Sequence, residues 1–105
     1  MSNRPVIYPS LLPPLRLKIH YRYRDHEFIF RFVKTPERDH FVIECLKHPG
    51  FNGQDSDPHK THLYRNNTIC FISGREPKTL QRCKELAGQW AKYFVEYRET
   101  GIAQQ

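Results

Sequence analysis

Residues 15–24 read LRLKIHYRYR, and this stretch decides the fold class. Apolar or aromatic side chains alternate with basic ones along it, and a period of two is typical of a half-buried β-strand. The inward face would carry Leu15, Leu17, Ile19, Tyr21 and Tyr23. The outward face would carry Arg16, Lys18, His20, Arg22 and Arg24.

The alternation continues beyond this first strand. Residues 28–33 predict a second strand with Phe28, Phe30 and Phe32 on one face, and residues 40–46 predict a third. Residues 68–72 also have strand composition. Because only short polar turns separate the first three strands, we expect an antiparallel meander of about four strands.

Residues 77–98 predict the one long helix, with Pro77 at its first position and Gly101 as its C-cap. Its apolar residues recur at steps of three and four and form one stripe. The stripe consists of Leu80, Cys83, Ala87, Trp90, Phe94 and Tyr97. Strands followed by a helix predict an α+β fold in which this helix packs on the meander.

Composition limits the class of protein. The 105 residues correspond to a single domain, residues 1–105, whose first fourteen residues carry four prolines and predict an extended arm. No apolar run approaches the roughly 18 residues of a membrane span, and no signal peptide opens the sequence. An odd number of cysteines, three, without a CxxC pair fits the reducing cytoplasm.

The net charge of +6 allows a polyanionic partner. However, the basic side chains of residues 16–24 point away from the tyrosines, so cations and stacking groups do not share a surface. This arrangement does not favour nucleic-acid binding, and a solvated outer face of the sheet stays open as an alternative. Arg16, Lys18, Arg22 and Arg24 are instead the candidate docking surface for an acidic protein.

Cys70 is the candidate functional thiol. It follows a long irregular loop, residues 47–62, and has His62, Tyr64, Asn66 and Asn67 just upstream. A thiol becomes nucleophilic beside a base or positive charge, and an Asn amide can stabilise an oxyanion. The residues alone also allow Cys70 to be a plain strand cysteine, and this alternative stays open. Cys45 and Cys83 occupy core positions of a strand and of the helix.

A metal site is not expected. His59 and His62, with Asp55 and Asp57, do not have the spacing of paired zinc ligands. The sequence also contains no cofactor motif.

Residues 62–71, HLYRNNTICF, resemble the catalytic segment of the prokaryotic ubiquitin-conjugating-enzyme-like family. That segment reads His-x-Tyr, a short polar turn, a small or polar residue, an aliphatic residue and the active Cys. The C-terminal helix is similar too, with Trp90, later aromatic residues and Thr100-Gly101, so the resemblance covers residues 40–102. Residues 48–52 contain a His-Pro pair, but they lie too far from Cys70 to be the eukaryotic His-Pro-Asn motif.

The resemblance implies a minimal ubiquitin-conjugating-like domain without the family's N-terminal helix. Cys70 would take an acyl group as a thioester from an activating enzyme and pass it to an amine. His62 and Tyr64 would shape the site, and Asn66 or Asn67 would form a turn near the thioester.

The family acts in bacterial antiphage (antiviral) defence operons. In the CBASS type, the conjugating protein acts on the C-terminus of a cyclic-oligonucleotide synthase. The resemblance therefore implies a cytoplasmic transferase whose partner is such a synthase. Two alternatives remain: a non-catalytic binding partner of the synthase, and a basic nucleic-acid-binding module that uses residues 16–24.

Overall fold

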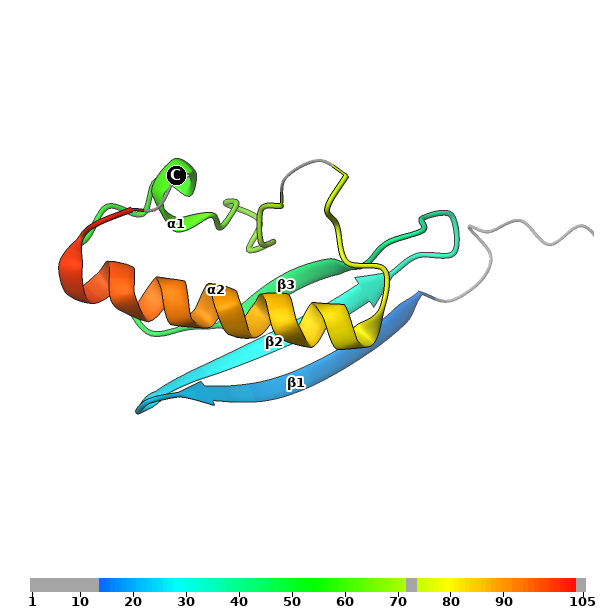
Figure 1. Cartoon of the computed structure of the whole chain (residues 1–105), viewed down its shortest axis with the longest axis horizontal. Coiled ribbons are helices and arrows are strands. Elements are labelled where there is room, and N and C mark those ends of the chain that lie inside the picture. Colours follow the sequence, from blue (N-terminus) through cyan, green and yellow to red (C-terminus); the bar gives the residue numbers. More distant parts are fainter. Residues whose placement is uncertain (1–13, 72–73, 104–105) are drawn as a thin grey trace, which may run out of the picture.

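The computed structural model describes residues 14–71 and 74–103. Its elements, in chain order, are β1 (Leu15–Tyr23), β2 (His26–Lys34), β3 (Val42–Lys47), α1 (Pro58–Thr61) and α2 (Leu80–Thr100). In Figure 1 the long helix α2 lies across one face of the sheet. The α+β class, with one main C-terminal helix on an antiparallel sheet, is therefore confirmed. Two predictions, the extended N-terminal arm and the lack of the family's N-terminal helix, concern a part of the chain outside the described residues.

The sheet has the order β1-β2-β3, and both pairs are antiparallel. Tyr23 pairs with His26, so only two residues connect β1 to β2. Arg24 in this connection has φ +54°, the left-handed backbone that tight hairpin turns use. The predicted meander is confirmed for three strands. The expected fourth strand, at residues 68–72, is reduced in the described residues to isolated bridges, Glu44 to Thr68 and Leu63 to Ile69.

The core lies between β2 and α2. Phe28, Phe30 and Phe32 are fully buried, as the alternation predicts. Trp90 of α2 meets the rings of Phe28 and Phe30 edge-on, each at a centroid distance of 6.0 Å. Burial of each Phe side chain contributes about 1.5–3 kcal/mol, so this layer supplies much of the stability.

The inward face of β1 is only partly buried. Tyr21 reaches α2 at Gly88, where an added Cβ would lie 3.3 Å from the Tyr21 hydroxyl oxygen. Leu15 and Leu17, by contrast, are 63% and 37% exposed. Both lie on the core-facing side, as predicted, since Leu17 pairs directly with the buried Phe32. They stay exposed because β1 is an edge strand and α2 covers only its Ile19–Tyr23 half.

Helix α2 begins later than predicted. The side chain of Thr79 caps it by accepting a hydrogen bond of 3.1 Å from the backbone N–H of Arg82. Pro77 lies before the helix, and its carbonyl accepts the N–H of Phe41 at 2.7 Å. Gly101 is the C-cap, as predicted, with φ +73° and its N–H donated to Tyr97. Of the predicted stripe, only Leu80 is exposed.

Candidate thiol site

A tight hairpin holds Cys70. The N–H of Asn67 donates to the carbonyl of Tyr64 at 2.9 Å, and the N–H of Tyr64 donates to Thr68 at 2.8 Å. Asn67 has φ +67°, which matches a three-residue loop that ends in a left-handed residue. The Cys70 N–H then donates to the carbonyl of His62 at 2.8 Å. The reversal predicted at Asn66-Asn67 is confirmed, and it brings residues 62 and 70 side by side.

The Cys70 thiol meets the Tyr64 hydroxyl across this hairpin. Sγ and the hydroxyl oxygen are 3.1 Å apart, the thiol is half-buried and Tyr64 is 48% exposed. The hydrogen bond with Cys70 raises the pKa of Tyr64, and the charge interaction between the two groups acts in the same direction. Tyr64 therefore keeps its proton at neutral pH and can donate it to an oxygen or sulfur anion that forms beside it.

The two asparagines shape the turn. The side-chain oxygen of Asn66 accepts the N–H of Thr68 at 3.2 Å and its hydroxyl at 2.6 Å. The backbone carbonyl of Asn67 accepts the N–H of Cys45 at 2.7 Å, which ties the hairpin to β3. Both residues thus act on Cys70 by fixing the backbone around it.

His62 adjoins the site through its backbone. It ends α1 with φ +55°, and its ring lies 5.2 Å from the ring of Tyr93, centroid to centroid. Its carbonyl is the acceptor of the Cys70 N–H. The structure therefore supports a positioning role for His62.

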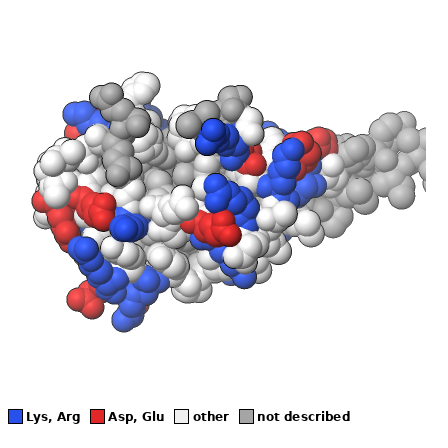
Figure 2. All heavy atoms as spheres, viewed as in Figure 1, with Lys and Arg blue, Asp and Glu red and all other residues white. Residues whose placement is uncertain are grey.

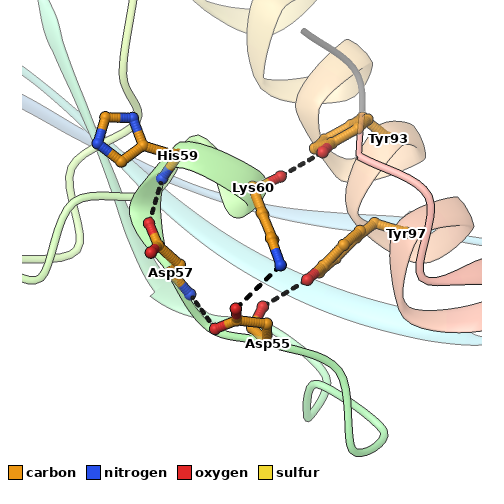
Figure 3. Close-up of polar contacts among 6 residues, drawn as sticks. All are labelled: Asp55, Asp57, His59, Lys60, Tyr93 and Tyr97. Atoms are coloured by element: carbon orange, nitrogen blue, oxygen red, sulfur yellow. Dashed lines mark hydrogen bonds and ion pairs between the residues drawn. The ribbon is translucent and has the colours of Figure 1, made fainter.

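Three aromatic residues of α2 anchor the chain that leads into this hairpin. Trp90 donates its indole N–H to the carbonyl of Thr61 at 3.0 Å. Tyr93 donates to the carbonyl of Lys60, and Tyr97 donates to the carbonyl of Asp55 at 2.6 Å (Figure 3). A single helix face thus fixes residues 55–61, directly before His62.

The anchored segment has polar contacts of its own (Figure 3). Lys60 pairs with Asp55 at 3.1 Å, and Asp57 accepts the N–H of His59 at 2.8 Å as the cap of α1. The helical stripe predicted burial of Trp90 and Tyr97 but not these bonds. The sequence does contain a chemical signal for these bonds. A buried Trp or Tyr needs a hydrogen-bond partner for its N–H or O–H group, and a long irregular loop offers backbone carbonyls that are not used in secondary structure.

The other two thiols are buried. Burial raises the pKa of Cys45 to about 12, and Cys45 donates its thiol to the carbonyl of Lys47 at 3.3 Å. Burial also raises the pKa of Cys83, to about 11. Both match their predicted core positions. Cys70 is therefore the most accessible of the three thiols.

Two hollows flank Tyr64. One has a volume of about 190 Å³, and its lining includes the apolar side chains of Phe41, Val42 and Ile69 and the carboxylate of Glu76. The other has a volume of about 220 Å³, and Arg65 and Asn67 are among its lining residues. A chain bound in either hollow would lie next to the residue that contacts the thiol.

The predicted docking residues do not all stay together. Arg22 pairs with Glu27 at 2.7 Å across the β1–β2 hairpin. Arg24 lies in the turn and pairs with Glu99 of α2 at 3.3 Å, because its left-handed backbone ends the alternation of β1. The placement of Arg24 beside the other three is thus wrong. Arg16 and Lys18 have no ion pair with any residue in the described ranges.

Figure 2 shows acidic side chains interspersed among the Lys and Arg side chains on the visible face. On β2 and β3, for example, Arg31 pairs with Glu44 at 2.6 Å. Arg31 is thus compensated within the sheet, whereas Arg16 and Lys18 have no such carboxylate among the described residues.

Comparisons with protein-family models, with curated proteins and with solved structures found no match. Among the described residues, no helix has the length and hydropathy of a membrane span. The same residues bring no three His, Cys, Asp or Glu side chains close enough together to share a metal ion.

Proposed function

We propose that the protein is a cysteine-dependent acyl transferase of the ubiquitin-conjugating type, with Cys70 as the thioester-forming residue. The observation that carries the proposal is the 3.1 Å contact between the Cys70 thiol and the Tyr64 hydroxyl on a hairpin braced by α2. A covalent acyl carrier needs a nucleophile, a nearby donor and a fixed backbone. The site offers all three.

In the proposed reaction, the Cys70 thiol loses its proton to solvent, and the resulting thiolate attacks the carbonyl carbon of an acyl thioester on an activating enzyme. A carbon–sulfur bond forms, the oxygen becomes an oxyanion, and the carbonyl reforms as the activating enzyme's thiolate leaves. An amine then attacks the Cys70 thioester, loses a proton to solvent and forms an amide, and the Cys70 thiolate is released. Tyr64 donates its hydroxyl to the oxyanion in both steps.

The acceptor in this proposal belongs to a cyclic-oligonucleotide synthase of a bacterial antiphage system, and the protein acts in the cytoplasm. Support comes from the resemblance of residues 62–71 to the family's catalytic segment. The uncompensated cations at the start of β1 provide a surface for an acidic partner.

Thiol labelling tests the reactive residue. In limited iodoacetamide treatment followed by peptide mass spectrometry, we expect Cys70 to be modified first. Cys45 and Cys83 should react slowly, because burial keeps them protonated. The Cys70→Ser variant should lose the fast phase and keep the slow one. If Cys70 is the slowest of the three, the enzymatic proposal fails.

A second candidate is a non-catalytic binding partner of the same synthase. It is favoured by the partner of the Cys70 thiol: among the described residues, the one side-chain hydrogen bond of this thiol is to a neutral hydroxyl, which supplies no positive charge to stabilise a thiolate. Tyr64→Phe distinguishes the two. The transferase should lose most of its thioester formation and keep its affinity for the synthase, whereas a pure binder would show no thioester in either form.

A further inference from the structure

The structure assigns a second functional surface to the outer edge of β1. We propose that this edge binds an extended acidic segment of a partner protein as an added β-strand. This edge of the sheet lies opposite to Cys70, and binding there does not depend on the chemistry of that residue.

The outer edge of β1 carries backbone groups that no described residue pairs with. β1 is the terminal strand of the order β1-β2-β3, and it pairs with β2 over all nine of its residues. In an antiparallel pair, alternate residues direct their N–H and C=O groups away from the neighbouring strand. No hydrogen bond from the described part of the chain reaches the outward groups of Leu15–Tyr23. β1 also lacks proline, so every residue of this edge keeps its backbone N–H donor.

The charge of β1 favours an anionic occupant of this edge. The outward face of this strand carries Arg16, Lys18 and Arg22, and of these only Arg22 is compensated by a carboxylate within the described residues. Cations on an edge strand repel a second copy of the same edge. Self-pairing of two β1 edges would bring like charges together, whereas an acidic strand would neutralise them. The residues that discourage self-association therefore select an anionic partner.

The opposite face of the same strand offers exposed apolar side chains. Leu15 and Leu17 alternate with the cations along β1, and both are exposed. An added strand places its own side chains beside those of its neighbour, on both faces. The best occupant therefore alternates carboxylates, which lie beside Arg16 and Lys18, with apolar side chains, which lie beside Leu15 and Leu17.

This surface is compatible with access to the thiol. The hairpin that carries Cys70 bridges to β3 at the far side of the sheet. With neighbouring strands about 4.8 Å apart, the β1 edge and that hairpin are separated by about 14 Å. In Figure 1 the free side of β1 likewise lies away from the segment between α1 and α2. A partner held at β1 would thus leave Cys70 open to a second molecule.

The test uses the full chain and a short fluorescent peptide in which Glu alternates with Val, measured by fluorescence anisotropy at about 0.15 M salt. Two control peptides separate the contribution of charge from that of backbone hydrogen bonds. One replaces Glu by Lys, and the other carries methyl groups on alternate backbone nitrogens. We expect the acidic peptide to bind and each control to bind at least about tenfold more weakly. Hydrogen exchange should show new protection at alternate amides of β1.

Protein variants complete the test. Arg16→Glu combined with Lys18→Glu should lower the affinity for the acidic peptide by about tenfold or more. Lys84→Glu, an exposed site on α2, should leave the affinity unchanged. Cys70→Ser should bind like the wild type, so a failure of the thiol chemistry would not be mistaken for a failure here.

Several results would overturn the inference. These are equal binding of the methylated peptide, equal binding of the basic peptide, unchanged exchange in β1, or no binding of the acidic peptide. A concentration-dependent dimer that protects the same amides would assign the edge to a second copy. Tight DNA binding at the same salt, lost in the Arg16→Glu/Lys18→Glu variant, would assign it to nucleic acid.

Discussion

Trp90 joins the core to the candidate site, so its replacement should affect both. Its ring lies against Phe28, Phe30 and Phe94, and its indole N–H donates to the carbonyl of Thr61. Trp90→Ala removes the whole ring and should lower the free energy of unfolding by roughly 3–5 kcal/mol. A domain of this size has only about 5–15 kcal/mol in total, so this variant should be partly unfolded on mild heating.

Trp90→Phe separates the hydrogen bond from the packing. It keeps an aromatic ring but leaves the Thr61 carbonyl without its buried donor, which should cost about 1–3 kcal/mol. The melting temperature should then fall by roughly 5–20 °C. Because Thr61 precedes His62, the bond from the Cys70 N–H to His62 should also open more often.

Native-state hydrogen exchange at the Cys70 amide measures this second effect. Phe94→Leu is the matched control, since Phe94 is fully buried on the same helix but has no polar tip. We expect Trp90→Phe to speed exchange at Cys70 more than Phe94→Leu does, at comparable loss of stability. If the Cys70 amide exchanges equally fast in the two variants, α2 does not hold the hairpin in place through Trp90.

Three further results are expected. Thr79→Ala should lower the free energy of unfolding, measured by urea denaturation, by about 1 kcal/mol because α2 loses its N-cap. Thr79→Ser should restore most of this free energy. An equal loss in both variants would contradict the capping role of the Thr79 hydroxyl. The free energy of unfolding should be constant with respect to thiol ionisation below pH 9 and should fall as the pH rises toward 11 or 12, because the fold keeps Cys45 and Cys83 protonated while the unfolded chain ionises them. Cys45→Ala should reduce the slope of this fall with pH. An unchanged slope would refute thiol burial as its cause. His62→Ala should slow transfer at Cys70, because Ala disfavours the positive φ that positions the carbonyl accepting the Cys70 N–H, and His62→Asn should restore most of the rate; equal slowing in both variants would contradict this backbone role. Neither variant should change the metal content, and one equivalent of zinc, present in the wild type and lost in both, would turn the loop into a metal site.

The period-two and helical patterns were sufficient to predict most of the fold. The three phenylalanines of β2 and the buried stripe of α2 follow from spacing alone, because burial on one face is a local property of each element. The exposure of Leu15 and Leu17 does not follow from spacing. It depends on where α2 crosses the sheet, and a strand's own sequence does not contain that information.

The candidate site was predicted in part. The Asn66-Asn67 turn and its closeness to Cys70 follow from turn chemistry within a short segment. The bonds from Trp90, Tyr93 and Tyr97 to residues 55–61 join parts of the chain about thirty to forty residues apart. Such contacts are set by tertiary packing, so no local pattern specifies them.

The most direct test of the central claim is capture of the acyl group on Cys70. The protein is incubated with a ubiquitin-type activating enzyme, the acyl donor and ATP, and the adduct is analysed by non-reducing gel and peptide mass spectrometry. The proposal predicts an adduct on Cys70 that thiols remove, and an oxyester in the Cys70→Ser variant that thiols leave intact. No adduct on wild-type protein, or an adduct that persists in Cys70→Ala, would contradict the assignment of Cys70 as the acyl carrier.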